Sequence, residues 1–181
     1  MHFVFHLLIF FYNFNLIKMK SFLTLAIALI LALASLAQNG QIPSVKLKDI
    51  EGNTINTSDL VKDGKPVIIS FWATWCSPCK RELNSYAEYY EDWQDETGVT
   101  IIAVSVDDQR SVGRVAPYVN SVEWDYTILL DTNNDFKRAM QVLNVPHTFL
   151  IDAKGNIVWQ ANNYSPGDED ELYEELLKLV D

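Results

Sequence analysis

Residues 67–80 read VIISFWATWCSPCK and contain both cysteines of the chain. The apolar, β-branched run at 67–71 predicts a buried strand. A polar, helix-forming stretch follows, so the CSPC tetrapeptide at 76–79 is expected where a strand passes into a helix. Pro78 suits the first helical turn, where its missing N–H would be unpaired in any case.

Cysteines spaced C-x-x-C can alternate between a dithiol and a disulfide. At a helix N-terminus, unpaired backbone N–H groups and the helix dipole stabilise a thiolate, which lowers its pKa from the free value of about 8.5. Cys76 could then attack a substrate disulfide, and Cys79, one turn further, could resolve the mixed disulfide. We therefore predict that Cys76 and Cys79 are catalytic and form a redox-active disulfide.

Two structural uses of the cysteine pair are the alternatives. A zinc site usually needs four Cys or His ligands, whereas this chain has no third cysteine and only His147 downstream. A static disulfide would close a very short loop, for which the entropic gain is small. The spacing therefore favours a redox couple, and we predict no metal and no cofactor.

The N-terminal part of the chain carries two apolar blocks, at 3–17 and 22–36, separated by a Lys-Met-Lys sequence. The second block has lysines before it and a Ser-Leu-Ala sequence ending at Ala37 after it, which are the three parts of a secretory signal. The block is 15 residues long, short of the ~20 needed to span a bilayer. We predict a signal peptide over 1–37, with Met19 as the true start.

An uncleaved membrane anchor is the alternative for this leader, because the two apolar blocks are consecutive. Cleavage would leave one domain over 38–181. The chain has 14 Lys and Arg against 24 Asp and Glu, and only Lys18 and Lys20 precede this domain, so its formal charge is near −12. Such an acidic domain is not expected to bind nucleic acid. Export to an oxidising compartment suits disulfide chemistry, so we expect a periplasmic protein or a membrane-anchored one that faces the periplasm.

Hydrophobic patterning divides the domain into strands that alternate with helices, after a short β-hairpin over 45–56. Gly98 is a natural stop for the helix that follows the cysteines. The pattern predicts an α/β fold with a mixed sheet, on which ligands bind beyond the carboxyl ends of strands. Strands are expected at 67–71, 99–106, 126–130, 147–151 and 157–160, and helices at 77–97, 110–120 (broken or bent by Pro117), 135–143 and 169–180.

Three stretches carry a family resemblance: VIISFWATWCSPCKRE at 67–82, IIAVSVD at 101–107 and NVPHTFLID at 144–152. Together with Gly155 they resemble the thioredoxin superfamily from about Ser44 onward, most closely its TlpA/ResA-like branch of exported thiol–disulfide oxidoreductases. The resemblance implies a thioredoxin-like fold, a mixed central sheet flanked by helices with an N-terminal β-hairpin extension. It also implies an enzyme, a protein-disulfide oxidoreductase.

The resemblance implies substrate-binding residues around the cysteines. Pro146 matches the cis-proline of the family, which lies against the cysteine pair. A cis bond would direct the backbone of Val145 toward the cleft, where it could pair with an extended substrate segment. Trp75, next to Cys76, is expected to shield the sulfurs and to contact substrate.

An acid–base residue is also implied. Glu82 stands three residues after Cys79, where ResA-like proteins carry an acidic residue, and it could relay protons to or from Cys79. Thioredoxin itself has an aspartate where Ser70 stands here, which makes Glu82 the stronger candidate. His147 either lies near the sulfurs, where a cation would favour the thiolate, or faces away from them, because adjacent strand residues point to opposite faces.

Family resemblance further favours reduction of exported proteins that contain disulfides, with apocytochrome c (cytochrome c biogenesis) as a candidate substrate and a membrane thiol donor as partner. A peroxiredoxin-type peroxidase is one alternative, but the Pro-x-x-x-Thr-x-x-Cys arrangement is absent. A copper-binding protein that uses Cys76, Cys79 and His147 is the other, since soft thiolates suit Cu(I). The C-x-x-x-C pattern of copper carriers with this fold is absent too.

Overall fold

The computed structural model describes residues 40–61 and 64–180. The chain from Gly40 onward forms one compact unit. The predicted signal peptide or anchor lies outside the described residues. Within the described part of the chain, no helix is long and apolar enough to cross a membrane.

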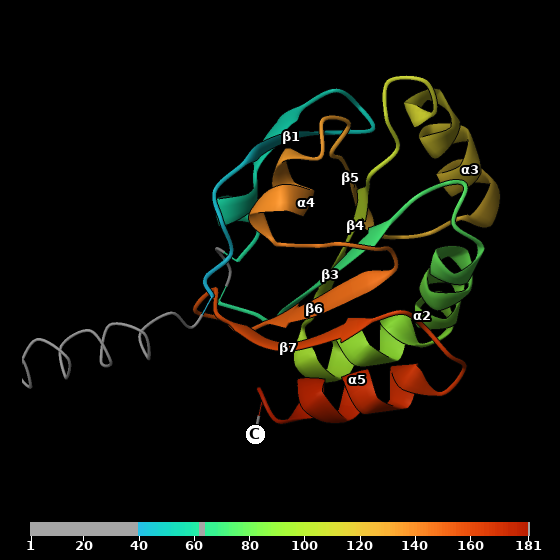
Figure 1. Ribbon diagram of the computed structural model, residues 1–181. Coiled ribbons are helices and arrows are strands. Elements are labelled where there is room, and N and C mark those ends of the chain that lie inside the picture. Colours follow the sequence, from blue (N-terminus) through green and yellow to red (C-terminus); the bar gives the residue numbers. More distant parts are fainter. Residues whose placement is uncertain (1–39, 62–63, 181) are drawn as a thin grey trace, which may run out of the picture. The chain divides into compact units, whose positions relative to one another are not determined.

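Seven strands and a set of helices make up this unit (Figure 1). The strands are β1 (Lys46–Asp49), β2 (Thr54–Asn56), β3 (Val67–Trp72), β4 (Thr100–Ser105), β5 (Thr127–Leu130), β6 (His147–Ile151) and β7 (Ile157–Asn162). The α-helices are α2 (Ser77–Thr97), α3 (Val115–Val122), α4 (Asp135–Ala139) and α5 (Asp168–Leu177), with short 3₁₀ turns η1 (Thr57–Asp59) and η2 (Val112–Arg114).

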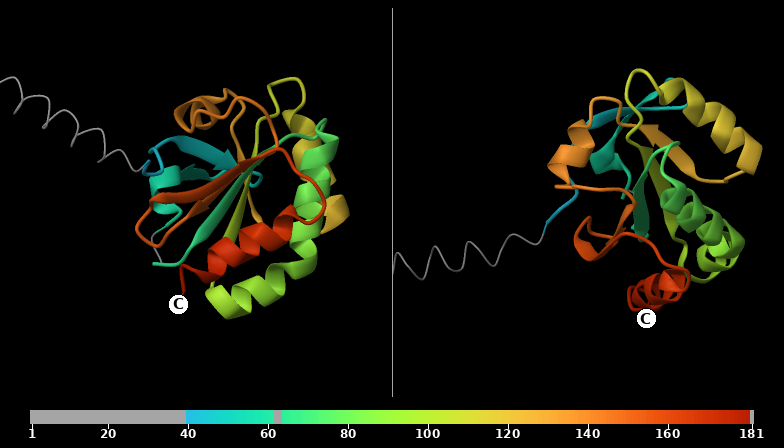
Figure 2. Two further views of the ribbon diagram at one scale, coloured as in Figure 1. Left: turned by 60° about the horizontal axis from the view of Figure 1, so that its bottom comes forward. Right: turned by 45° about the vertical axis from the view of Figure 1, so that its right-hand side comes forward.

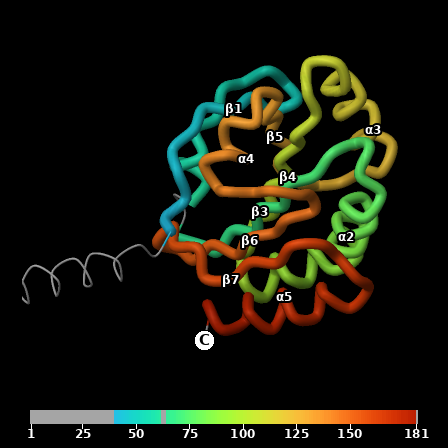
Figure 3. Tube along the Cα trace, in the orientation of Figure 1, coloured from blue at the N-terminus to red at the C-terminus, as the bar shows by residue number. Residues whose placement is uncertain are grey.

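The strands form one mixed sheet in the order β2-β1-β5-β4-β3-β6-β7. The central pairs β3–β4 and β4–β5 are parallel, and the remaining pairs are antiparallel. The trace in Figure 3 shows β6 and β7 following β3 across the sheet. The predicted N-terminal hairpin is confirmed, and it extends the sheet because β1 pairs with β5.

Alternation along β3 assigns the helices to the two faces of the sheet. The side chain of Ser70 reaches Glu82 on α2, whereas the ring of its neighbour Phe71 packs on Phe136 of α4 at 5.3 Å. Since successive strand residues point to opposite faces, α2 and α4 cover opposite sides. Figure 2 shows α5 beside α2 and α4 on the other side of the sheet. All six residues of β3 are buried, as a doubly covered central strand requires.

Helix α2 begins and ends where the sequence predicted, at Ser77 and Thr97. Gly98 terminates it in the left-handed conformation, with φ at 69°. A glycine adopts this conformation without the steric cost that a Cβ would add. The helix therefore starts at the cysteine motif and runs uninterrupted for 21 residues.

The helix expected at 110–120 begins later than predicted, and the prediction that Pro117 breaks or bends it is wrong. A 3₁₀ turn occupies Val112–Arg114, and α3 runs from Val115 to Val122. Pro117 lies in the first turn of α3, where no intrahelical N–H bond is lost, so it does not break the helix.

The helix expected at 135–143 is shorter than predicted and ends at Ala139. Gln141 adopts a left-handed conformation with φ at 57°, which no helix residue can have. Because no glycine or proline marks this stop, the sequence carried no local signal for it.

Candidate active site

The two cysteines form a disulfide at the start of α2, with Cα atoms 5.4 Å apart. Cys76 is the N-cap residue, and its sulfur accepts a hydrogen bond from the backbone N–H of Cys79 at 3.2 Å. The Cys76 residue is 5% exposed and Cys79 is fully buried. The more accessible cysteine is therefore the one whose sulfur also accepts an N–H of the helix terminus.

Charges around this terminus favour an anion. The first turn of α2 contains no acidic residue, so nothing there opposes the positive end of the helix dipole. Lys80 follows the pair, and its Nζ lies 5.2 Å from the ring centroid of Tyr118 on α3. A thiolate at Cys76 would thus gain both an N–H donor and a favourable field.

Glu82 lies one turn after Cys79 and is almost completely buried. Three hydroxyl groups donate to its carboxylate: Ser70 at 2.8 Å, Thr148 at 2.9 Å and Tyr86 at 3.2 Å. Residues three apart in a helix share a face, so Cys79 and Glu82 point to the same side of α2. The side chain bridges three elements, since its partners belong to β3, β6 and α2.

Burial raises the pKa of Glu82 to about 7, and the three hydroxyl donors oppose this rise. Desolvation disfavours the charged carboxylate, whereas hydrogen bonds to it favour that form. A group with this pKa exchanges a proton readily near neutrality, as an acid–base residue must. The sequence identified Glu82 but neither Thr148 nor Tyr86.

Asp107 is a second buried carboxylate, and sequence reasoning assigned it no role. It accepts hydrogen bonds from the backbone N–H of Thr74 at 2.8 Å and from the Thr74 hydroxyl at 2.6 Å. The Ser105 hydroxyl donates to it at 2.9 Å. Asp107 thus fixes the loop that precedes Cys76. Its place two residues after β4, beyond the carboxyl end of a central strand, was the signal available in the sequence.

The Val145–Pro146 peptide bond is cis, as predicted. It directly precedes β6, whose His147 is the register partner of Phe71 in β3. Because β6 runs antiparallel to β3, the start of β6 and the end of β3 meet at one edge of the sheet. The Pro146 segment and the cysteine loop therefore emerge from the same edge.

His147 faces away from the side of the sheet that carries the cysteines. Its ring stacks on Phe149 at 4.4 Å, and Phe149 in turn packs on Phe71. Thr148, the next residue, points to Glu82 on the opposite face. Burial lowers the pKa of His147, and a hydrogen bond with Gln160 partly offsets this. Of the two alternatives for His147, the contacts support the one in which the imidazole faces away from the sulfurs.

Among residues 40–61 and 64–180, no three His, Cys, Asp or Glu side chains are grouped so that they could hold a metal ion. Cys76 and Cys79 therefore do not form a metal cluster with His147, which the copper-binding alternative requires.

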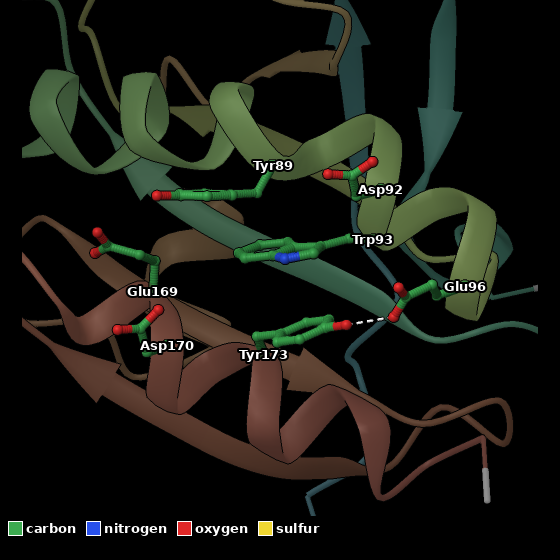
Figure 4. Close-up of a pocket in the computed structure, with 7 residues that line it drawn as sticks. All are labelled: Tyr89, Asp92, Trp93, Glu96, Glu169, Asp170 and Tyr173. Atoms are coloured by element: carbon green, nitrogen blue, oxygen red, sulfur yellow. Dashed lines mark hydrogen bonds between the residues drawn. The ribbon is translucent and has the colours of Figure 1, made fainter.

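A separate groove lies between the C-terminal half of α2 and α5 (Figure 4). Trp93 stacks between Tyr89 and Tyr173, with ring centroids 6.1 and 5.8 Å away. Tyr173 donates a hydrogen bond to Glu96. The groove contains no nucleophile or base of the cysteine site, and we treat it as packing between two helices. It is lined by Tyr89, Asp92, Trp93, Glu96, Glu169, Asp170 and Tyr173.

The fold and the paired cysteines define a protein of thioredoxin type. Residues 39–160 match the model of the AhpC/TSA family. Thiol–disulfide oxidoreductase ResA of Bacillus subtilis is 35% identical over 124 residues, which cover 68% of this chain and 66% of that protein. ResA of Halalkalibacterium halodurans is 31% identical over 147 residues, or 81% of this chain and 79% of that protein.

A solved structure supports the same assignment. The solution structure of a thioredoxin-like protein from Porphyromonas gingivalis is 49% identical, with a TM-score of 0.69, and covers 77% of this chain and 91% of that one. The chain belongs to the AhpC/TSA family of thioredoxin-like proteins and, within it, to the ResA-like thiol–disulfide oxidoreductases.

Proposed function

We propose that this protein reduces disulfides in exported proteins by dithiol–disulfide exchange. The observation that carries the proposal is the Cys76–Cys79 disulfide at the N-terminus of α2, with the Cys76 sulfur placed to receive the Cys79 N–H. A pair so placed can be reduced and reoxidised while the rest of the fold stays intact. The relatives named thiol–disulfide oxidoreductase ResA support the exchange chemistry, and the reductive direction and the exported substrates are part of the proposal.

In the reduced protein, the Cys76 thiolate attacks one sulfur of a substrate disulfide. The substrate S–S bond breaks, a mixed disulfide forms, and the departing substrate thiolate takes up a proton. Cys79 then gives its proton to the carboxylate of Glu82 and attacks the Cys76 sulfur. The mixed disulfide breaks, the second substrate sulfur leaves as a thiolate that takes the proton back from Glu82, and the Cys76–Cys79 disulfide forms. Two electrons pass from protein to substrate; one proton comes from Cys79 by way of Glu82, and the one taken up in the first step comes from solvent.

The substrate is held, in this proposal, by Trp75 and by the Val145–Pro146 segment. Trp75 is 62% exposed, unusually so for a tryptophan, and it adjoins the attacking cysteine. Val145 and Pro146 come from the same edge of the sheet as the cysteine loop. An extended substrate segment could pair with the Val145 backbone while its cysteine meets Cys76.

The setting is proposed as the periplasm, with residues 1–37 serving as a cleaved signal or as an uncleaved membrane tether. Apocytochrome c is a candidate substrate and a membrane thiol donor is the candidate reductant of the disulfide. N-terminal sequencing of the exported protein distinguishes cleavage after Ala37 from retention of the leader.

Turnover of insulin disulfides by the full chain tests the mechanism. Cys76→Ser should abolish turnover, and Cys79→Ser should accumulate mixed disulfides with substrates. Retained turnover in Cys76→Ser would contradict the mechanism.

A redox titration of the cysteine pair decides the direction of electron flow: a potential near ~−270 mV indicates a reductant and one near ~−120 mV an oxidant. Peroxide consumption would instead favour the peroxidase alternative.

A further inference from the structure

A groove beside the cysteine pair has an unusual combination of charge and apolar surface. It has a cavity volume of about 320 Å³. One wall of the groove is Trp75, the chain neighbour of Cys76, and the other wall is the segment that joins β4 to α3. The lining residues are Trp75, Val106, Asp108, Arg110, Ser111 and Arg114.

The groove is cationic in a domain that is strongly acidic. Its lining contains two arginines, Arg110 and Arg114, and a single carboxylate, that of Asp108. Asp108 pairs with Arg110 at 2.9 Å, but this arginine side chain is 91% exposed, and ion pairs so exposed hold their partners weakly. Arg114 makes no ion pair or side-chain hydrogen bond within the described part of the chain. Its guanidinium is available to another molecule.

Further basic residues lie close to Trp75 in the chain. Lys80 and Arg81 follow the cysteines on α2, and Lys80 lies over the ring of Tyr118 on α3. Two neighbouring acidic residues, Glu82 and Asp107, are buried and already accept hydrogen bonds. An approaching chain would therefore meet mostly positive charge, while the bulk of the domain would repel an acidic one. Charge segregation of this kind directs both the position and the orientation of a partner.

The wall of the groove is also well ordered. Asp108 accepts the backbone N–H of Arg110 at 2.9 Å through its side chain. Its carbonyl oxygen accepts the N–H groups of Ser111 and Val112 at 3.0 and 2.8 Å. Asp107, the preceding residue, accepts the N–H of Thr74, the chain neighbour of Trp75. These hydrogen bonds fix the backbone that carries Arg110 and the backbone beside Trp75, which preorganises the two walls of the groove for a ligand.

We propose that this groove is a specificity subsite that binds an acidic side chain next to the cysteine of the substrate polypeptide. The inference rests on the proposed disulfide exchange and adds to it the chemical class of the substrate segment. A carboxylate can accept paired hydrogen bonds from a guanidinium. The indole of Trp75 gives the neighbouring apolar part of the segment a surface to cover.

Three synthetic peptides test the subsite. Each contains one intramolecular disulfide with the same cysteine spacing, and the residues flanking it are glutamates, glutamines or lysines. The readout is the second-order rate constant with which each peptide oxidises the reduced full chain. At low ionic strength we expect the glutamate peptide to react about tenfold faster than the glutamine peptide, and the lysine peptide to react slowest. High salt should remove the difference, because it shortens the Debye length from ~30 Å at 0.01 M to ~3 Å at 1 M.

Variants assign the preference to the groove. In Arg110→Gln/Arg114→Gln the glutamate-to-glutamine rate ratio should fall to near one. The matched control is Arg138→Gln, because Arg138 on α4 is also exposed and also pairs with an aspartate, Asp135 at 2.6 Å. Arg138 lies on the other side of the sheet, so this variant should keep the full ratio. The charge reversal Arg110→Glu/Arg114→Glu should instead prefer the lysine peptide, a gain that misfolding cannot produce.

Two outcomes would overturn the subsite alone. Equal rates for the glutamate and glutamine peptides in the unaltered protein would do so, and so would a preference that survives in the double glutamine variant. If none of the three peptides oxidised the cysteine pair, the proposed disulfide exchange would fail, and the subsite with it.

Discussion

The two ends of helix α2 have opposite chemistry. Its first two turns carry the disulfide and two cations, Lys80 and Arg81, and they lie at the edge of the sheet where a substrate can approach. Its last turns carry aromatic rings and carboxylates that pack against α5 (Figure 4). The N-terminal end carries the reactive groups, whereas the C-terminal end packs the helix against α5.

The difference shows how a rigid element can support a reactive terminus. Changing the redox state of the cysteines alters a covalent bond at the N-terminus of α2, and we expect the aromatic packing far along the helix to keep α2 in place. Between the two ends lies Glu82, which is buried like a core residue yet ionisable like a site residue. The comparison therefore predicts that substitutions at the C-terminal end of α2 lower stability and leave activity intact, whereas substitutions at its N-terminal end lower activity.

The largest effect on stability is expected for Trp93→Ala. Trp93 is buried and packs between Tyr89 and Tyr173. Removing a large buried ring leaves a cavity and should lower the free energy of unfolding by about 3–5 kcal/mol. The rate of peptide disulfide reduction by the folded protein should stay within about twofold of wild type. Urea unfolding and single-turnover kinetics measure the two quantities. A large loss of rate in folded Trp93→Ala would show that the C-terminal end of α2 also contributes to activity.

A pH-dependent loss of stability is expected from Glu82. Its pKa of about 7 lies above the ordinary value of 4.5, so the native state holds a proton that the unfolded state releases. The stabilising contribution is complete below pH 4.5, falls as the pH rises toward 7, and is then lost. The total is about 3 kcal/mol, at 1.36 kcal/mol for each unit of pKa difference.

Urea unfolding of the disulfide form from pH 4 to pH 8 measures this contribution, taken as the difference between wild type and Glu82→Gln. The glutamine amide does not titrate, so the difference in unfolding free energy should decline over that interval. A constant difference would show that Glu82 titrates normally. Glu88→Gln on the exposed side of α2 is the control.

The same substitution should slow the second chemical step. In Glu82→Gln no carboxylate accepts the proton of Cys79, and general base catalysis is worth about 100-fold or more. Rapid-quench measurement of mixed-disulfide resolution should show this loss at neutral pH. In wild type the rate should rise through pH 7 as the carboxylate forms, and the variant should lack this inflection. An unchanged profile would exclude Glu82 as the proton acceptor.

Local sequence signals were enough for the elements that define the fold. The bounds of α2, Ser77 and Thr97, were predicted because the cysteine motif and the helix-stopping Gly98 are both local signals. Partners of the buried carboxylate were not predictable, since Thr148 contacts Glu82 from 66 positions away. The end of α4 was missed for a different reason. Gln141 takes a left-handed conformation, which is uncommon for a glutamine and so could not be predicted from the residue type.

A smaller loss of stability is expected for Asp107→Asn. The carboxylate accepts the backbone N–H and the hydroxyl of Thr74, and an amide would present a donor where one of these acceptors is needed. Leaving a buried donor unpaired should cost about 1–3 kcal/mol of unfolding free energy. Asp108→Asn is the matched control, because this neighbour is partly exposed and water can replace its bonds. Equal urea midpoints for the two variants would contradict the anchoring role of Asp107.

The smallest effect is expected for Tyr173→Phe. The phenylalanine ring keeps the stack on Trp93, and the only bond lost is the one that the hydroxyl donates to Glu96 at the protein surface. Water can satisfy both groups in that exposed position. The urea midpoint and the rate of disulfide reduction should therefore both equal those of wild type within error. If Tyr173→Phe were as unstable as Trp93→Ala, the far end of α2 would be held by its polar contact, and the rings would contribute little to fixing the helix.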